Sequence, residues 1–272
     1  MIAIVDYGAG NIRSVLNALR RSLDSLALAR DDKSVVSTEA ARPSWEPSGM
    51  RGPAGRAQTS RPEEIVLTAD KAILRAADKV ILPGVGEAST AMKALSDCGL
   101  AEFIPTLTQP VLGICIGAQL MCRSSEEGGA RCMGIFSTDV CRFDPSSGEK
   151  IPHMGWNSLF APAPLLSRPV AGAATVSSRA TVPVTSRATA PPSSRAQSRD
   201  LSSPLFKGLP EGSYVYFVHS FYPELCPDTI AVSHHGVDFS AALAKDNFFA
   251  CQFHPEKSGA VGETILRNFL SL

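Results

Sequence analysis

The sequence predicts an α/β fold, in which helices flank a mostly parallel sheet that continues into a mixed or antiparallel extension. Short apolar runs typical of buried strands alternate with helix-forming stretches through the first half of the 272 residues. Some of these runs end directly in glycine-bearing turns, as in Leu82-Pro83-Gly84-Val85-Gly86. The last third is rich in aromatic and β-branched residues, which favour the strands of the extension.

The first half of the chain supplies the parallel sheet and its helices. Val15, Leu16 and Leu19 recur at helical spacing and predict a helix from Ile12 to about Leu23. Strands are expected at 2–5, 65–67, 79–82 and 111–114, and further helices at 71–76, 87–96 and just before Pro110.

The second half supplies the extension. Short strand-like pieces surround Ile135 and Val140, and residues 152–157 form an unusual run of bulky and turn residues. Further strands are expected at 214–221, 229–233, 241–244 and 248–253. An amphipathic helix from Glu263 to Leu270 closes the chain.

Two segments of biased composition interrupt this pattern, at about 31–62 and 161–204. The first is dense in Pro, Gly, Ser and Arg, and the second contains a near-repeat, in which residues 178–181 recur as 186–189. Such segments cannot bury enough apolar surface to offset the entropy of ordering them. We therefore expect disordered insertions within one domain that spans residues 1–272, with a basic adhesive arm as the alternative for the second.

Composition excludes several classes of function. Acidic and basic residues balance at 26 each, which gives no electrostatic reason to expect nucleic acid or an anionic membrane as partner. No apolar run reaches the roughly 18 residues that a membrane span needs, so we expect a cytoplasmic protein. The seven cysteines include no C-x-x-C pair, so neither a metal site nor a disulfide framework is indicated. No cofactor is expected either, because the glycine loop at 6–11 lacks the remaining residues of a nucleotide-binding motif.

Residues 111–123 carry the strongest local signal for chemistry. A short apolar run leads into Cys115, which Gly113 and Gly117 bracket before a helix-forming stretch begins. A strand, a sharp turn and a helix in this order place the nucleophile of G-x-S-x-G hydrolases. At the start of a helix the free N–H groups favour a thiolate and so lower the pKa of a cysteine. The alternative is a cysteine that packs as a small hydrophobe, and this stretch alone leaves both open.

A nucleophilic cysteine needs a base, and His254 is the candidate among five histidines. It follows a strand-like run and stands in His254-Pro255-Glu256, where Pro255 disfavours helix. In an extended tripeptide the side chains of His254 and Glu256 project to the same side, so Glu256 is placed to accept a hydrogen bond from one ring nitrogen. The other nitrogen is then free for the thiol.

Two of these stretches, Gly113-Ile114-Cys115-Ile116-Gly117-Ala118-Gln119 and Gln252-Phe253-His254-Pro255-Glu256-Lys257-Ser258, resemble the class I, triad-type glutamine amidotransferases. Four more runs resemble one branch of that family, the glutaminase subunits of imidazole glycerol phosphate synthase. These runs are DYGAGN at 6–11, LPGVG at 82–86, PHMGWN at 152–157 and YFVHS at 216–220. The likeness covers the chain except the two biased segments, and it implies a flavodoxin-like fold.

The resemblance also implies roles for individual residues. Cys115 would attack the side-chain amide of glutamine, His254 would act as base and then as acid, and Glu256 would orient His254. Backbone N–H groups of Ile116 and of the Gly84-Val85 turn would hold the oxyanion. Glutamine would lie near Gly86, Gln119, Glu127, Ser220 and Phe221.

A partner is implied as well. Ammonia would pass to a (β/α)8-barrel cyclase subunit that makes imidazole glycerol phosphate in histidine biosynthesis. Asn11, Met154, Trp156 and Lys257 would belong to the docking surface, with an ordinary core position as the alternative for Trp156.

The sequence departs from the branch at a few positions and leaves other functions open. Ile116 and Ala118 stand where Leu and Met are common, and Phe221 replaces a frequent Tyr. The alternatives are the glutaminase subunit of an anthranilate or guanylate synthase, a cysteine hydrolase of another substrate class such as a peptidase, and a non-catalytic module. The intact Cys115, His254 and Glu256 argue against the last of these.

Overall fold

A seven-stranded sheet forms the centre of the protein, whose computed structural model describes residues 1–8, 10, 12–36, 64–162 and 201–272. The strand order is β11-β12-β13-β4-β3-β1-β2. Five neighbouring strands are parallel: β1 (Ile2–Val5), β2 (Ile65–Thr68), β3 (Lys79–Leu82), β4 (Val111–Ile114) and β13 (Phe248–Cys251). The strands β12 (Val237–Lys245) and β11 (Thr229–His235) continue the sheet antiparallel. The predicted fold class is thereby confirmed.

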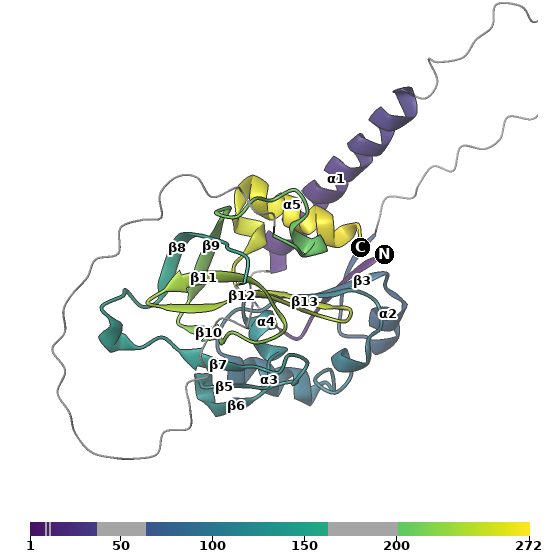
Figure 1. Ribbon diagram of the computed structural model, residues 1–272. Coiled ribbons are helices and arrows are strands. Elements are labelled where there is room, and N and C mark those ends of the chain that lie inside the picture. Colours follow the sequence, from purple (N-terminus) through teal and green to yellow (C-terminus); the bar gives the residue numbers. More distant parts are fainter. Residues whose placement is uncertain (9, 11, 37–63, 163–200) are drawn as a thin grey trace, which may run out of the picture.

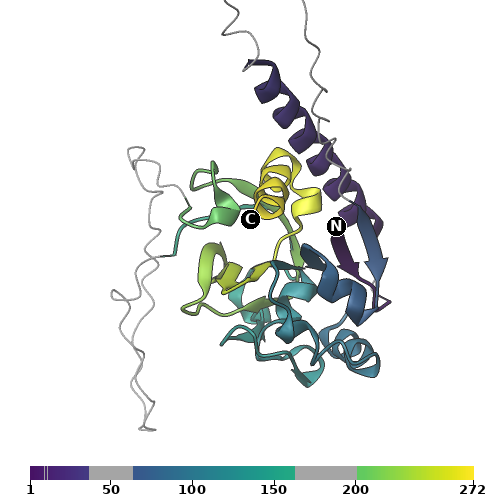
Figure 2. The same cartoon turned by 90° about the vertical axis from the view of Figure 1, so that its right-hand side faces the viewer.

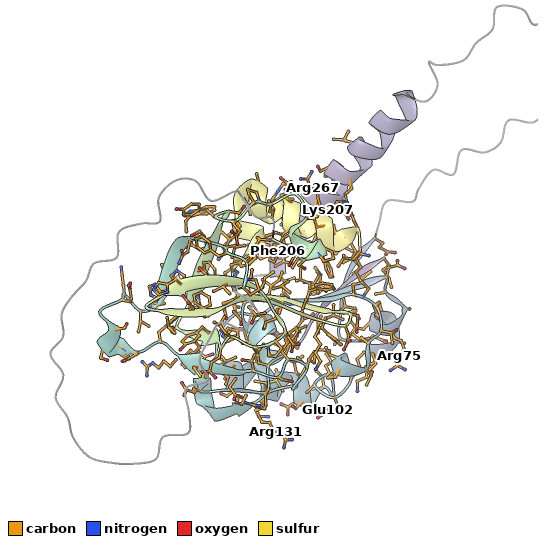
Figure 3. All side chains as sticks on the ribbon, in the orientation of Figure 1. Arg75, Glu102, Arg131, Phe206, Lys207 and Arg267 are labelled. Carbon is orange, nitrogen blue, oxygen red and sulfur yellow. The ribbon has the colours of Figure 1, made fainter. Side chains whose placement is uncertain are left out.

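Helices cover both faces of this sheet (Figure 1). α1 (Ile12–Val36) and α5 (Gly259–Leu270) pack against each other on one face. α3 (Ala88–Asp97) and the short α4 (Ile116–Leu120) lie on the other, and α2 (Lys71–Ala76) connects β2 to β3. Apolar side chains fill the space between the layers, whereas the charged groups of Arg75, Glu102 and Arg131 lie at the periphery (Figure 3).

Two smaller sheets lie beside the carboxyl ends of β4 and β13. One has the order β10-β7-β5-β6, built from β10 (Phe221–Pro223), β7 (Asp139–Arg142), β5 (Ser124–Ser125) and β6 (Ala130–Arg131). The other is the antiparallel pair of β8 (His153–Ser158) and β9 (Tyr214–His219). Short 3-10 helices connect these elements: η1 (Ile104–Thr106), η2 (Glu127–Gly129), η3 (Pro145–Ser147), η5 (Pro204–Phe206) and η6 (Pro255–Lys257).

The first helix is longer than predicted. The sequence predicts that this helix ends at about Leu23, directly after the buried Ser22. Instead, the helix continues to Val36 and projects beyond the sheet (Figures 1 and 2). Residues 24–36 include Leu, Ala, Arg and Lys, whose intrinsic preference for helix is high. The biased segment expected from about 31 therefore begins inside α1.

Other boundaries also differ. The helix expected before Pro110 is only the 3-10 turn η1, Ile135 lies in no strand, and the last helix begins at Gly259 rather than Glu263. Leu201 and Ser203 are buried, so the second biased segment ends before 204. The rest of the two predicted insertions, residues 37–63 and 163–200, lies outside the described residues. Among the described residues, no helix is both long and apolar enough to cross a membrane.

Candidate active site

Cys115 occupies a strained turn at the carboxyl end of β4. Its φ of 53° and ψ of −110° lie where a non-glycine residue rarely stays unless its surroundings hold it there. The Cys115 N–H donates to the Cys251 carbonyl at 2.8 Å, and the Cys115 carbonyl accepts from Ala118 at 3.0 Å as α4 begins. The strand, turn and helix expected around this cysteine are therefore present.

Glycine is required where the turn packs on the neighbouring strand. A Cβ atom at Gly117 would lie 2.0 Å from the Leu82 carbonyl oxygen, and one at Gly84 would lie 2.5 Å from the Gly117 nitrogen. Only hydrogen fits at these positions. The turn after β3 and the start of α4 thereby approach each other within backbone contact.

His254 reaches the same edge of the sheet because β13 is the parallel neighbour of β4. Its Nδ1 lies 2.7 Å from Glu256 Oε1, as expected from the sequence. Since a carboxylate only accepts, Nδ1 carries the proton and Nε2 is the free nitrogen. The backbone differs from the expectation, because Pro255–Lys257 form the 3-10 turn η6 instead of an extended tripeptide.

The side chains of His254 and Glu256 are buried, and one polar atom of each has no hydrogen-bond partner among the described residues. The side chains of His254 and Glu256 are 3% and 1% exposed, and neither His254 Nε2 nor Glu256 Oε2 has a hydrogen-bond partner among the described residues. Burial alone lowers the pKa of His254, but its interactions with Cys115 and Glu256 outweigh burial and raise the pKa to about 9. An imidazole with this pKa is protonated at neutral pH.

A cleft of about 230 Å³ opens over Cys115 and His254. It brings together all five residues expected to hold glutamine, namely Gly86, Gln119, Glu127, Ser220 and Phe221. Besides these residues, Cys115 and His254, five more line the cleft: Val85, Ile116, Pro152, Val218 and His219. Burial raises the pKa of Glu127, and Glu87 adds to this, whereas the N–H of Ala88 donates to Glu127 Oε2 at 2.8 Å and lowers it. Glu127 thus also caps the first turn of α3.

The residues expected to form an oxyanion site divide into two groups. Val85 and Ile116 line the cleft, and Ile116 is the first residue of α4, where backbone N–H groups are free. Gly84 does not line the cleft but packs behind it against Ile116 and Gly117. Tyr7 supports the same turn, since its hydroxyl donates to the Pro83 carbonyl at 2.8 Å.

An exposed aromatic patch lies beside the site on β8, β9 and η6. Met154 is 61% exposed and Trp156 is 56% exposed, so the core alternative for Trp156 is wrong. Trp156 contacts Tyr216 edge to face at 6.0 Å, and the Lys257 ammonium lies 6.0 Å from the Tyr216 ring. We call these four residues the β8 patch. Asn11, expected on the same surface, lies outside the described residues.

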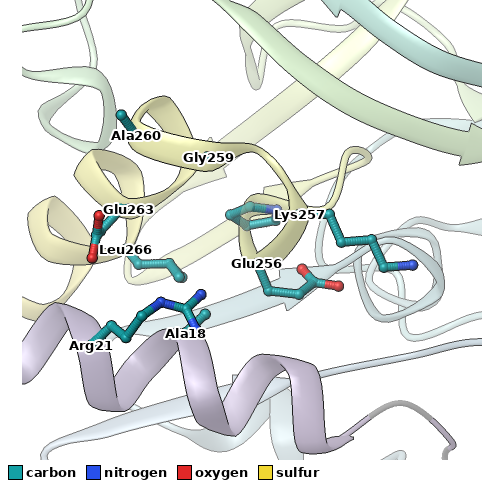
Figure 4. Close-up of a pocket in the computed structure, with 9 residues that line it drawn as sticks. Ala18, Arg21, Glu256, Lys257, Gly259, Ala260, Glu263 and Leu266 are labelled. Atoms are coloured by element: carbon teal, nitrogen blue, oxygen red, sulfur yellow. The ribbon is translucent and has the colours of Figure 1, made fainter.

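A second pocket of about 330 Å³ lies behind the triad, between α1 and α5 (Figure 4). Glu256, Arg21 and Glu263 line it. Arg21 reaches into it from α1. The carboxylate that accepts from His254 therefore also lines a second pocket with charged side chains.

Three residues at or beside the cleft had no role predicted from the sequence. Gln252 Nε2 lies 3.9 Å from Cys115 Sγ, Tyr7 supports the turn after β3, and His219 lines the cleft. Each lies within one of the motifs that carry the family resemblance, QFHPE, DYGAGN or YFVHS. This position within a motif was the only sequence signal for its place at the site.

Comparison with known proteins gives matches to one family along most of the chain. Residues 56–272 match the family Glutamine amidotransferase class-I. The imidazole glycerol phosphate synthase subunit HisH of Bacteroides fragilis (strain YCH46) is 42% identical over 272 residues, covering 100% of this chain and 99% of the relative. The HisH subunit of Shewanella sediminis is 41% identical over 214 residues, covering 77% and 80%.

Solved structures share the fold at lower identity. A structure described as a GMP synthase subunit, from Thermoplasma acidophilum, has a TM-score of 0.55 at 19% identity, covering 99% of this chain and 92% of that one. A second structure, described as a glutamine amidotransferase, has a TM-score of 0.53 at 15% identity, covering 100% and 98%. The chain belongs to the class I glutamine amidotransferases and, within them, to the HisH family, the glutaminase subunits of imidazole glycerol phosphate synthase.

Proposed function

We propose that the chain hydrolyses glutamine to glutamate and ammonia through Cys115, His254 and Glu256, and delivers the ammonia to a (β/α)8-barrel cyclase subunit. One observation carries the proposal: a cysteine held at φ 53° shares a cleft with a buried histidine whose Nδ1 is bound to a carboxylate. This is the arrangement that an activated nucleophile and its base require.

The chemistry proceeds in two halves. The Cys115 thiolate attacks the side-chain amide carbon, and the oxygen takes up negative charge next to the N–H groups of Ile116 and Val85. Losing one such donor typically costs about 3 kcal/mol in the transition state. Protonated His254 gives its Nε2 proton to the departing ammonia, which leaves a glutamyl thioester. His254 then takes a proton from water, which hydrolyses the thioester and restores the thiolate.

Recognition of glutamine follows from the polar groups of the cleft. Gln119 Oε1 is buried without a partner among the described residues, so it is placed to accept an N–H of the substrate. Glu127 presents a carboxylate that suits an α-ammonium group. Phe221, where a Tyr is frequent, leaves its carbonyl oxygen engaged by Gln119 and His219, so no hydroxyl is needed there to orient Gln119.

The proposal is tested by glutamate release in the presence of the cyclase and its ligand. Wild type should release glutamate, and Cys115→Ala should release none because no other described group in the cleft is a nucleophile at that position. Cys98→Ala is the matched control, since Cys98 is exposed at the end of α3 and lies outside the cleft. No release by wild type, or release by Cys115→Ala, would contradict the proposal.

The β8 patch is our proposed docking surface for the cyclase. Trp156 and Met154 expose large apolar groups next to Lys257, which follows the triad residue Glu256 directly. Exposed aromatic anchors of this kind dominate binding energies at interfaces, and truncating one costs about 2 kcal/mol or more, about 30-fold in Kd. Trp156→Ala should weaken cyclase binding accordingly, whereas Leu67→Ala, also exposed but on the edge strand β2, should not. Equal binding by both variants would refute this surface.

A further inference from the structure

Two buried histidines that take no part in the proposed chemistry connect β8 to the cleft. His153 on β8 and His219 at the end of β9 are each 6% exposed. His153 stacks on His235 with ring centres 4.2 Å apart and planes at 18°. The rings of Phe143, Phe217 and Phe239 enclose His153 and His219.

The hydrogen bonds of this pair have one possible direction. The Phe221 carbonyl lies 2.8 Å from His219 Nδ1, and because a carbonyl only accepts, that nitrogen carries the proton. In neutral His219 the other nitrogen, Nε2, must accept, and its partner at 2.9 Å is Nδ1 of His153. His153 Nε2 then accepts from Asn157 Nδ2 at 3.2 Å, and the same amide donates to the His234 carbonyl at 2.8 Å.

Both histidines are neutral at pH 7. Burial, aided by His235, lowers the pKa of His153 to about 4. Burial also lowers the pKa of His219 to about 3, with a smaller opposing effect from the Phe221 carbonyl. A chain of neutral rings with fixed tautomers holds a geometry without carrying charge.

The chain continues from the Phe221 carbonyl to the nucleophile. That oxygen also accepts from Gln119 Nε2 at 3.0 Å, and Gln119 Nε2 donates to Gln252 Oε1 at 2.9 Å. Gln252 Nε2 in turn lies 3.9 Å from Cys115 Sγ. Since two acceptors use the amide nitrogen of Gln119, its oxygen is turned away from them and stays unpartnered among the described residues.

We propose that His153 and His219 are positioning residues for the glutamine cleft. They fix the Phe221 carbonyl, which together with Gln252 orients Gln119 so that Oε1 is open to the substrate. The idea rests on the proposed function, because it assumes that glutamine binds beside Gln119. It makes β8, which carries Met154 and Trp156, one end of a continuous hydrogen-bonded chain that ends at Cys115.

Two substitutions at His219 separate positioning from packing. His219→Asn keeps an amide donor close to the position of Nδ1, whereas His219→Phe keeps the ring and loses both hydrogen bonds. With the cyclase present, His219→Phe should raise KM for glutamine at least tenfold with a smaller change in kcat. His219→Asn should stay within about threefold of the wild-type KM, since a tenfold change corresponds to about 1.4 kcal/mol.

Covalent labelling of Cys115 gives a readout that a general loss of structure would not produce. The glutamine analogue 6-diazo-5-oxo-norleucine needs the cleft, whereas iodoacetamide needs only an accessible thiolate. Mass spectrometry of the Cys115 peptide should show at least tenfold slower labelling of His219→Phe by the analogue, with the iodoacetamide rate within twofold of wild type.

Each outcome decides the question. Unchanged KM and analogue labelling in His219→Phe, equal damage in His219→Asn, or parallel loss of both labelling rates would overturn the positioning role. If His219→Phe does not fold, His219→Leu replaces it, because Leu also lacks both hydrogen bonds, and the same contrast with His219→Asn is expected. A wild type without glutaminase activity would instead remove the proposed function and leave no role for the chain of histidines to explain.

Discussion

Replacing Glu256 by Gln tests the electrostatics of the site with little change in shape. Gln keeps an oxygen that can accept from His254 Nδ1 at the observed 2.7 Å, so the ring need not move. What disappears is a negative charge whose side chain is 1% exposed. The variant therefore isolates the effect of that charge on His254.

The magnitude follows from the pKa of His254. The rise from 6.5 to about 9, achieved against burial, corresponds to about 3 kcal/mol in favour of the imidazolium, shared between Cys115 and Glu256. A hydrogen bond to a charged group contributes about 1.5–3 kcal/mol and a neutral one about 1 kcal/mol. Glu256→Gln should thus remove about 1–2 kcal/mol and lower the pKa of His254 by about one unit.

The assay is the pH dependence of glutaminase activity with the cyclase present. The alkaline limb of the kcat profile should move down by about one pH unit, because the imidazolium that protonates the departing ammonia loses its proton at lower pH. kcat should fall about tenfold, while KM stays unchanged since Glu256 does not line the glutamine cleft. Glu263→Gln is the control, because Glu263 lines the same second pocket (Figure 4), whereas His254 Nδ1 donates to Glu256. An alkaline limb at the wild-type pH would refute the reasoning.

The same pKa shift makes stability depend on pH with a defined sign. A group whose pKa is raised on folding stabilises the folded state fully below its unfolded pKa, here 6.5, and this contribution is lost as pH rises through about 9. Urea denaturation should show a smaller loss of unfolding free energy over this window in Glu256→Gln than in wild type. Parallel curves would place the origin of the shift elsewhere.

Two further predictions concern the turns that support Cys115. Gly117→Ala gains about 1 kcal/mol of helix propensity, but its Cβ meets the Leu82 carbonyl at 2.0 Å, so urea denaturation should show a net loss of at least about 2 kcal/mol. Gly148→Ala, at φ 81° with nothing within 4 Å, should lose only about 1 kcal/mol, and equal losses would contradict the contact argument. Tyr7→Phe removes the hydrogen bond to the Pro83 carbonyl and should lower kcat up to about tenfold at constant KM, and a raised KM with unchanged kcat would argue against an effect on the oxyanion turn.

The parallel half of the fold was predictable because its signal is local. β1 and β4 are apolar at every position and buried at every position, as strands covered by helices on both faces must be. β8 was not recognised as a strand, because His153–Ser158 include Gly155 and Asn157 and show no period of two. Its pairing with β9, more than fifty residues later, makes it a strand.

The candidate site divides in the same way. The turn at Cys115 and the contact between His254 and Glu256 arise from neighbours in sequence, so the spacing indicated them. Gln252 and His219 gain their places from partners 133 and 66 residues away, which no local pattern encodes. The motifs indicate the region of the site, but not which atoms meet there.

The strand β9 links the β8 patch to the proposed catalytic residues. β9 is bonded to the backbone of the triad, since the Tyr216 carbonyl accepts from the His254 N–H at 2.9 Å and the Tyr216 N–H donates to Ser258 Oγ at 2.9 Å. Trp156 packs against the side chain of the same Tyr216. A partner that binds the β8 patch therefore contacts β9, the strand whose backbone is hydrogen-bonded to His254. Through the hydrogen bond between His153 and His219, the same partner is also connected to the strand that lines the cleft. The antiparallel extension encloses these histidines with Phe239 of β12, and it thereby connects the turn at Cys115 to the proposed docking surface, the β8 patch.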